Sequence, residues 1–110
     1  MIDLSHFPDF TRKVYMATMN IPSGKLSTYQ FIAEAAGNPN AARAVGNILR
    51  ANPYAPTIPC HRVIASDGRL SGYQGPNVMR KISLLQAEGI AVRLKFSALE
   101  MRELIVRPIC

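Results

Sequence analysis

Cys60 and His61 are the residues of this sequence best suited to covalent chemistry. They follow a segment with three prolines, 51–59, which we expect to form a fixed, extended loop. A cysteine attacks as its thiolate, and a neighbouring base or positive charge, here His61 and Arg62, favours that form. The pair is therefore a candidate nucleophile and base. The alternative is a small buried cysteine beside a hydrogen-bonded histidine, and adjacency alone does not decide between them.

Other uses of these side chains are less compatible with the sequence. Cys60 and Cys110 are the only two cysteines, which is too few for a disulfide framework, and we expect thiols. A structural zinc site needs about four ligands at compatible spacing, and here only Cys60 and His61 are adjacent. We expect no metal and no cofactor.

Two helices joined by a short turn are expected before the cysteine. Residues 27–30 read as a capping box with Ser27 as N-cap, opening a short helix to about Ala36. Asn40 is the expected N-cap of the next helix, which should run from Ala41 to about Arg50. Helix, short turn and helix together predict a helix-turn-helix.

The remaining elements are short and bounded by glycine, proline or capping residues. They are a helix over 7–19, a hairpin of 62–64 and 69–72 around Asp67-Gly68, a helix over 76–88, a strand over 91–95, and a last helix opened by a capping box at 97–100. We predict a mainly α, winged-helix-like DNA-binding domain with a helix-turn-helix and a small β-hairpin or wing, spanning 1–110 as a single domain.

Composition limits the function classes. The 110 residues carry 13 Lys and Arg against 7 Asp and Glu, a net charge of +6. Such an excess favours a polyanionic partner such as nucleic acid, although a basic surface kept for solubility explains it equally well. No apolar run approaches the roughly 18–20 residues that span a bilayer, and the first ten residues lack the pattern of a signal peptide. We expect an intracellular protein, cytosolic or nuclear, with no membrane partner.

The sequence around Cys60, Pro59-Cys60-His61-Arg62-Val63, resembles the active-site region of the O6-alkylguanine-DNA alkyltransferases, which transfer an alkyl group from guanine to their own cysteine. The resemblance covers roughly Phe10 to Val92, and its central motif is highly specific. The other matching motifs are Ile21-Pro22-Ser23-Gly24-Lys25, Ser27-Thr28-Tyr29, Ala42-Arg43-Ala44-Val45-Gly46, Arg50-Ala51-Asn52-Pro53, Ser66-Asp67-Gly68, Gly72-Tyr73-Gln74-Gly75 and Leu84-Leu85-Gln86-Ala87-Glu88-Gly89.

The resemblance implies a role for each residue near the cysteine. Cys60 would accept the alkyl group, and His61 would act through a bridging water as the base that forms the thiolate. Glu88 would orient His61, a link that nothing but the resemblance suggests. Asn52 would brace the hinge between the second helix of the helix-turn-helix and the cysteine loop. By itself Asn52 reads as a turn former before Pro53, and both roles are compatible.

The resemblance also implies how DNA is bound. The helix over 41–50 would enter the minor groove, which admits it only where side chains are small. Arg43 would enter the base stack in place of an extruded guanine, and Tyr29 would press on the phosphate of the target nucleotide. The small residues are Ala41, Ala42, Ala44 and Gly46. Without the resemblance, they would indicate a face that packs against another helix.

The base pocket implied by the resemblance combines backbone and side-chain groups. Backbone groups near Cys60, Val63 and Gln74 would read the guanine edge, and Tyr73 would wall the pocket together with Tyr29. Without the resemblance, both tyrosines read as core or half-buried aromatics. Two features depart from the family pattern. The additional N-terminal domain of usual members has no room in this chain, and Gln74 stands where many members have serine.

The expected function is direct DNA repair, in which an alkyl group passes irreversibly from O6-alkylguanine in double-stranded DNA to Cys60. Each protein molecule would react once, and we expect it to be a monomer. The alternative is a non-enzymatic, alkyltransferase-like damage-binding protein. Such proteins share the small size but replace the nucleophilic cysteine, often by tryptophan, which the presence of Cys60 opposes. A cysteine hydrolase using His61 is a third class. A transcription factor is a fourth and leaves Cys60 unexplained.

Overall fold

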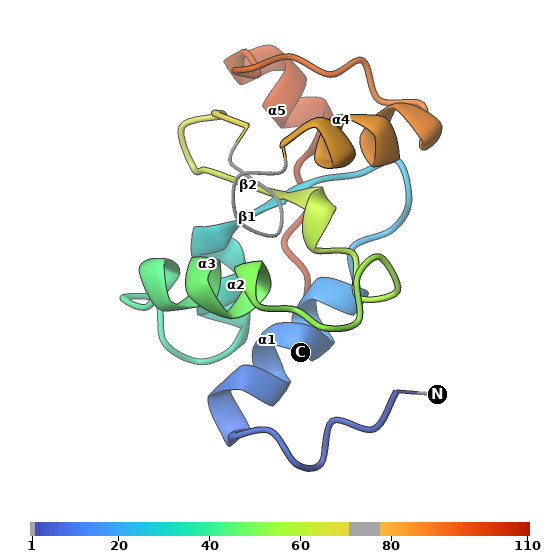
Figure 1. Ribbon diagram of the computed structural model, residues 1–110. Coiled ribbons are helices and arrows are strands. Elements are labelled where there is room, and N and C mark those ends of the chain that lie inside the picture. The colour runs from blue at the N-terminus through green and yellow to red at the C-terminus, as the bar shows by residue number, and fades with distance from the viewer. Residues whose placement is uncertain (1, 71–77) are drawn as a thin grey trace.

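The computed structural model describes residues 2–70 and 78–110, and within these ranges the chain is mainly helical. This confirms the fold class predicted from the sequence. The elements, in chain order, are α1 (Asp9–Met19), β1 (Ser27–Thr28), α2 (Tyr29–Ala35), α3 (Ala42–Arg50), a 3₁₀ helix (Cys60–Arg62), β2 (Val63–Ile64), α4 (Val78–Ala87) and α5 (Ala98–Leu104) (Figure 1).

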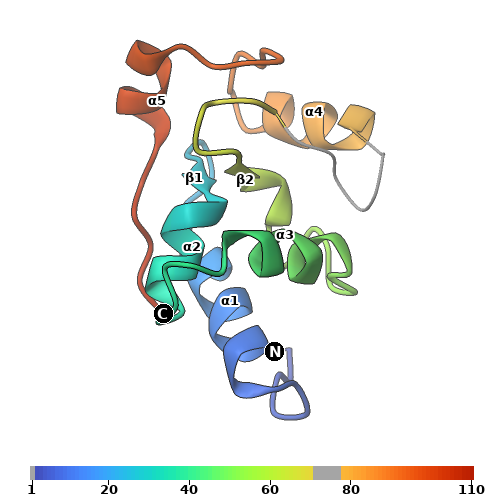
Figure 2. The same cartoon turned by 90° about the vertical axis from the view of Figure 1, so that its left-hand side faces the viewer.

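The small sheet lies between two groups of helices, with α1, α2 and α3 on one side and α4 and α5 on the other (Figures 1 and 2). β1 and β2 run parallel, with Ser27 opposite Val63 and Thr28 opposite Ile64. The strand that enters α2 is therefore paired with the strand that leaves Cys60. This pairing fixes the cysteine segment to the start of the helix-turn-helix.

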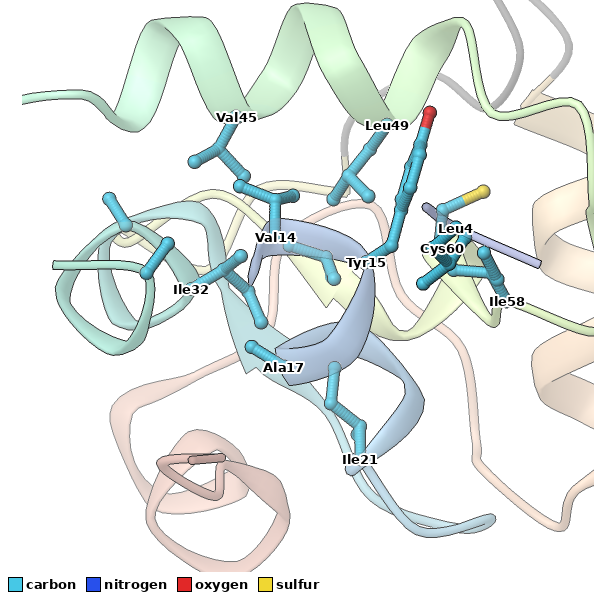
Figure 3. Close-up of a cluster of buried hydrophobic side chains, with 13 residues drawn as sticks. Leu4, Val14, Tyr15, Ala17, Ile21, Ile32, Val45, Leu49, Ile58 and Cys60 are labelled. Atoms are coloured by element: carbon cyan, nitrogen blue, oxygen red, sulfur yellow. The ribbon is translucent and has the colours of Figure 1, made fainter. Parts of the chain in front are cut away.

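Two clusters of buried apolar side chains hold these groups together. The larger joins α1, α2 and α3 to the cysteine loop and includes Val14, Ile32, Val45 and Cys60 (Figure 3). Full burial of one aliphatic side chain contributes roughly 1.5–3 kcal/mol, so these contacts dominate the stability of the unit. The smaller cluster lies beneath α4 and the C-terminal segment and consists of Leu26, Ile64, Leu85, Ile90 and Phe96.

The helix starts differ by one residue from the capping pattern in the sequence. Thr28, and not Ser27, caps α2 by accepting a hydrogen bond from the Phe31 N–H at 3.1 Å. Ser27 is held in β1, and its hydroxyl donates to the Val106 carbonyl instead. The N-cap of α3 is Ala41 without a side-chain cap, so the prediction for Asn40 was wrong. The capping box at 97–100 is confirmed.

Three predictions for extended structure are corrected. Residues 51–59 form successive turns, with a cis peptide bond before Pro56, because proline restricts the torsion angles without enforcing an extended path. The turn at 65–69 is present, closed by the Ala65 N–H and the Arg69 carbonyl, but β2 pairs with β1, and within the described residues up to 70 it forms no hairpin across the turn. Residues 71–72 of the expected second arm lie outside the described residues. The strand expected over 91–95 is reduced to a single antiparallel bridge between Lys95 and Arg69.

The C-terminal segment lies along the outer edge of β1 and completes the second cluster. Leu26 donates to the Leu104 carbonyl at 2.9 Å and accepts from the Val106 N–H at 2.8 Å. A parallel bridge joins Leu26 to Ile105 between these two bonds. The edge of the sheet is therefore covered by residues that follow α5. No helix in the described ranges is long and apolar enough to cross a membrane.

Candidate active site and nucleic-acid interface

Cys60 lies at the margin of the larger cluster, where its side chain is only 5% exposed. Leu4, Ile58 and Tyr15 lie around it (Figure 3). Its backbone N–H donates to the Ile58 carbonyl at 2.8 Å, which tightens the chain just before the 3₁₀ helix. The proline-rich segment thus delivers the thiol at a defined position.

Asn52 ties the end of α3 to the cysteine loop. Its side chain is buried, and the amide Nδ2 donates to the Ile58 carbonyl at 2.9 Å. The amide oxygen Oδ1 accepts from the Tyr54 N–H, also at 2.9 Å. Asn52 therefore forms both the local turn before Tyr54 and the longer brace that the sequence suggested. The side chain thus links the end of α3 to the residue two positions before Cys60.

His61 and Glu88 are brought together although 26 residues lie between them in the sequence. Nε2 of His61 lies 2.6 Å from Oε2 of Glu88, and the imidazole is 1% exposed. The 3₁₀ helix supplies the histidine, and the residue after α4 supplies the carboxylate. Because Nε2 is engaged by Glu88, Nδ1 is the ring nitrogen left for chemistry toward a thiol.

Glu88 is itself fixed by groups that the sequence reasoning did not assign. Arg62 donates to it from Nε at 2.9 Å and from Nη2 at 2.9 Å, while Nη1 donates to the Ile21 carbonyl at 2.7 Å. The Gly24 N–H adds a bond of 3.2 Å to Oε1. The motif at 21–25 and the run at 58–63 therefore meet at one carboxylate. Arg62, taken from the sequence as a positive neighbour of the thiol, is the principal partner of Glu88.

The protonation states of this pair follow from burial and hydrogen bonding. Burial lowers the pKa of His61 below its ordinary value of 6.5, against the opposing effect of Glu88. Burial alone would raise the pKa of Glu88, but hydrogen bonds from Arg62, His61 and Gly24 outweigh it and lower that pKa. Near neutral pH the pair is a neutral imidazole beside a carboxylate. The Nε2–H donates to Glu88, which leaves the lone pair on Nδ1.

Lys81 is a buried cation beside the site that the sequence reasoning missed. Its side chain is fully buried, and Nζ donates to the Val63 carbonyl at 2.6 Å. Burial lowers the pKa of Lys81 to about 8, and interaction with Cys60 acts in the opposite direction. The available signal was its helical spacing, since Lys81 lies four residues before the buried Leu85 and shares its face. Its charge therefore lies close enough to the thiol to influence it.

The predicted DNA-contacting residues gather at a second place, on α3 and the start of α2. A hollow of about 360 Å³ is lined by Tyr29, Arg43, Gly46, Arg50 and Ser66, among others. A Cβ added to Gly46 would lie 4.0 Å from the ring of Tyr29, so α3 and the tyrosine pack closely here.

The small residues differ in exposure. Ala41, Ala42 and Gly46 are half-buried, whereas Ala44 is exposed with Arg43. The outer face of α3 thus carries a short side chain next to a long cationic one.

Tyr73 and Gln74, predicted for the base pocket, lie outside the described residues. No group of three or more potential metal ligands occurs within 2–70 and 78–110.

Residues 9–90 match the family described as 6-O-methylguanine DNA methyltransferase, DNA binding domain. The chain belongs to this family. The match begins at the first residue of α1 and ends just beyond Glu88, so it contains the cysteine segment, its His61–Glu88 contact and the helix-turn-helix. Residues 91–110 lie outside it.

Named methyltransferases resemble this region at high identity. The methylated-DNA–protein-cysteine methyltransferase of Rattus norvegicus is 48% identical over 82 residues, covering 74% of this chain and 39% of the relative. That of Mycobacterium leprae is 46% identical over 80 residues, covering 73% and 48%. The chain thus spans less than half the length of these curated relatives.

Two solved structures with bound DNA match this chain over different shares of their own length. Mycobacterium tuberculosis OGT in complex with DNA superposes with a TM-score of 0.70 at 45% identity, covering 74% of this chain and 49% of that one. S. pombe Atl1, in complex with damaged DNA containing O6-carboxymethylguanine, superposes with a TM-score of 0.79 at 33% identity. That match covers 91% of this chain and 96% of Atl1.

Proposed function

We propose that this chain repairs alkylated DNA directly, by a single transfer of the alkyl group from O6-alkylguanine to Cys60. The observation that carries the proposal is the hydrogen-bonded series from Arg62 through Glu88 to His61, which ends beside a buried cysteine on a braced loop. Nucleophile, base and orienting carboxylate form the arrangement that activates a cysteine. Membership of the methyltransferase family supports the same reaction.

In the proposed reaction the thiol proton passes through a water molecule to Nδ1 of His61, and Glu88 stabilises the resulting imidazolium. The thiolate then attacks the alkyl carbon. A carbon–sulfur bond forms as the carbon–O6 bond breaks, and its electron pair remains on guanine. The guanine takes up one proton, so the alkyl group and the thiol proton have exchanged places. The thioether is stable, and the protein is consumed.

The DNA side of the proposal uses the hollow on α3. Ala41, Ala42, Ala44 and Gly46 would allow α3 to approach the minor groove, and Arg43 would replace the extruded guanine in the stack. Tyr29, on the facing helix, would contact the target nucleotide. The Val63 backbone would read the base, with Tyr73 and Gln74 completing the pocket as the family resemblance implies. Recognition and chemistry would thus reside in one domain of this chain, with double-stranded DNA as its partner.

Intact-mass measurement after mixing with an O6-methylguanine duplex tests the proposal. Wild-type protein should gain one methyl group per chain, on the peptide that contains Cys60, and then stop reacting. Cys60→Ser should gain none and retain duplex binding, because a serine hydroxyl is far less acidic than a thiol. Cys110→Ser is the matched control and should react as wild type. Continued turnover would indicate a hydrolase instead.

A second candidate is lesion binding without transfer. The near-complete coverage of Atl1, whose structure holds O6-carboxymethylguanine DNA, favours it. The same experiment separates the two functions, since tight binding to the lesion duplex with no gain of mass would establish the second. We favour transfer because Cys60 and its partners are all present.

A further inference from the structure

A second hollow adjoins the one on α3 and has no role in the proposed chemistry. It lies between α2 and α5 and measures about 400 Å³. Phe31, Met101 and Ile105 give it apolar walls, and Arg102 and Arg107 add cationic groups. Ser66 lines both hollows, so the two adjoin at the turn after β2 and together make up the depression from α3 toward α5. In Figure 2, α3, the turn after β2 and α5 follow one another across the same face.

The pairing of the arginines distinguishes this face. Most arginines of the described residues already have a carboxylate partner, and these are Arg12, Arg62, Arg69, Arg93 and Arg107. Within residues 2–70 and 78–110, Arg43, Arg50 and Arg102 form no ion pair and are exposed. All three line the depression. Three exposed arginines that form no ion pair thus lie along the two hollows, which favours an anionic partner there.

Arg102 belongs to a segment held firmly against the domain. The residues on either side of Ile105 hydrogen-bond to Leu26, just before β1, and the Phe96 N–H donates to the Gly68 carbonyl at 2.8 Å. α5 itself is fixed at its start by the complete capping box at Ser97. This segment follows the family match, which ends at residue 90. Arg102 is therefore a positioned cation that the family's DNA-binding domain does not include.

We propose that the depression between α2 and α5 binds the sugar–phosphate backbone of the duplex that flanks the damaged base, with Arg102 contacting a phosphate. The inference rests on the proposed function of the α3 face. A backbone of alternating sugar and phosphate matches apolar walls with a cation at the rim, and phosphate contacts position a protein without reading sequence. Arg107, already paired with Glu34 and stacked 4.5 Å above the Phe31 ring, shapes the wall.

In a Cys60→Ser background, the salt dependence of binding to an O6-methylguanine duplex tests this contact, since the lesion fixes which flank of the duplex faces α5. Each phosphate neutralised contributes a slope of about 0.9 to the fall of log K with log salt concentration. Arg102→Gln should lower the slope by about one such unit, and Arg102→Lys should restore it. The loss should disappear when the duplex is shortened on the side that faces α5. With Cys60 present, the rate of methyl transfer at saturating duplex should remain that of wild type.

Arg12→Gln is the matched control, since it changes the net charge equally on α1, outside both hollows, and should leave the slope unchanged. If Arg102→Gln left the salt-dependence slope unchanged while Arg50→Gln reduced it, the proposed contact at α5 would be wrong and the DNA contact at α3 would stand. Salt-independent binding by wild type would instead overturn the proposed DNA function. Equal effects of Arg102→Gln on short and long duplexes would also contradict the inference.

Discussion

Oε2 of Glu88 lies 2.6 Å from Nε2 of His61, while the same carboxylate is held by Arg62 and the Gly24 N–H. In the neutral histidine the ring proton lies on Nε2, toward the carboxylate, and Nδ1 is the nitrogen that does not contact Glu88. The four groups come from three separate parts of the chain.

Glu88→Gln should slow alkyl transfer by roughly 100-fold, because a neutral amide orients His61 poorly and does not stabilise its charged form. It should also lower the free energy of unfolding by roughly 3 kcal/mol, since Arg62 loses its buried partner. Single-turnover kinetics and urea denaturation measure the two effects. Glu34→Gln, which removes a surface partner of Arg107, should change stability by about 1 kcal/mol or less. Equal losses in the two variants would contradict the buried arrangement.

The depressed pKa of His61 predicts a specific pH dependence of stability. Below pH 6.5 the unfolded chain binds a proton at this residue while the folded protein resists it, so stability falls as pH drops from 6.5 toward the lowered pKa. Above pH 6.5 His61 contributes no pH dependence. Denaturation curves at several pH values should show this loss in wild type and in His6→Gln but not in His61→Gln. A loss retained in His61→Gln would assign it to another group.

Lys81→Met should slow the reaction of Cys60 with iodoacetamide at neutral pH, because the variant lacks the buried cation that favours a thiolate. The advantage of wild type should shrink as pH rises through about 8, where Lys81 loses its proton. The comparison is made in a Cys110→Ser background, so that the reagent reports on Cys60. A difference that persists unchanged above this pH would show that Lys81 acts through packing and not through charge.

Gly68→Ala should destabilise the protein by roughly 3 kcal/mol, since the residue has a φ of +92° and its Cβ would lie 2.5 Å from the Phe96 carbonyl oxygen. Gly37→Ala is the matched control. It has a similar φ of +93° but open space around the Cβ, so it should cost about 1 kcal/mol. Thermal unfolding measures both. Equal losses would mean that the 65–69 turn does not pack closely on the C-terminal segment.

The local elements were largely determined by the sequence alone. Helical periodicity and the capping box at Ser97 depend on neighbouring residues, and they predicted the helices close to their observed places. The motif around Cys60 likewise indicated the candidate nucleophile, and that role stays a prediction. The prediction of the α2 N-cap was wrong because two neighbouring residues could each cap the helix. Ser27 and Thr28 are both good caps, and the ladder with β2 decided between them by holding Ser27 extended.

Tertiary structure alone decided the partners of the site. Nothing in the local sequence links Arg62 to Glu88 or Ile21, because contacts between residues far apart in the chain leave no periodic pattern in the sequence. Lys81 was hidden for a related reason, since helical spacing gives the face of a residue but not the carbonyl that satisfies it. The hollow between α2 and α5 likewise combines residues of both ends of the chain, which the bridge between Leu26 and Ile105 brings together. Sequence thus specified the reactive residues, and packing specified their charge states and the surface around them.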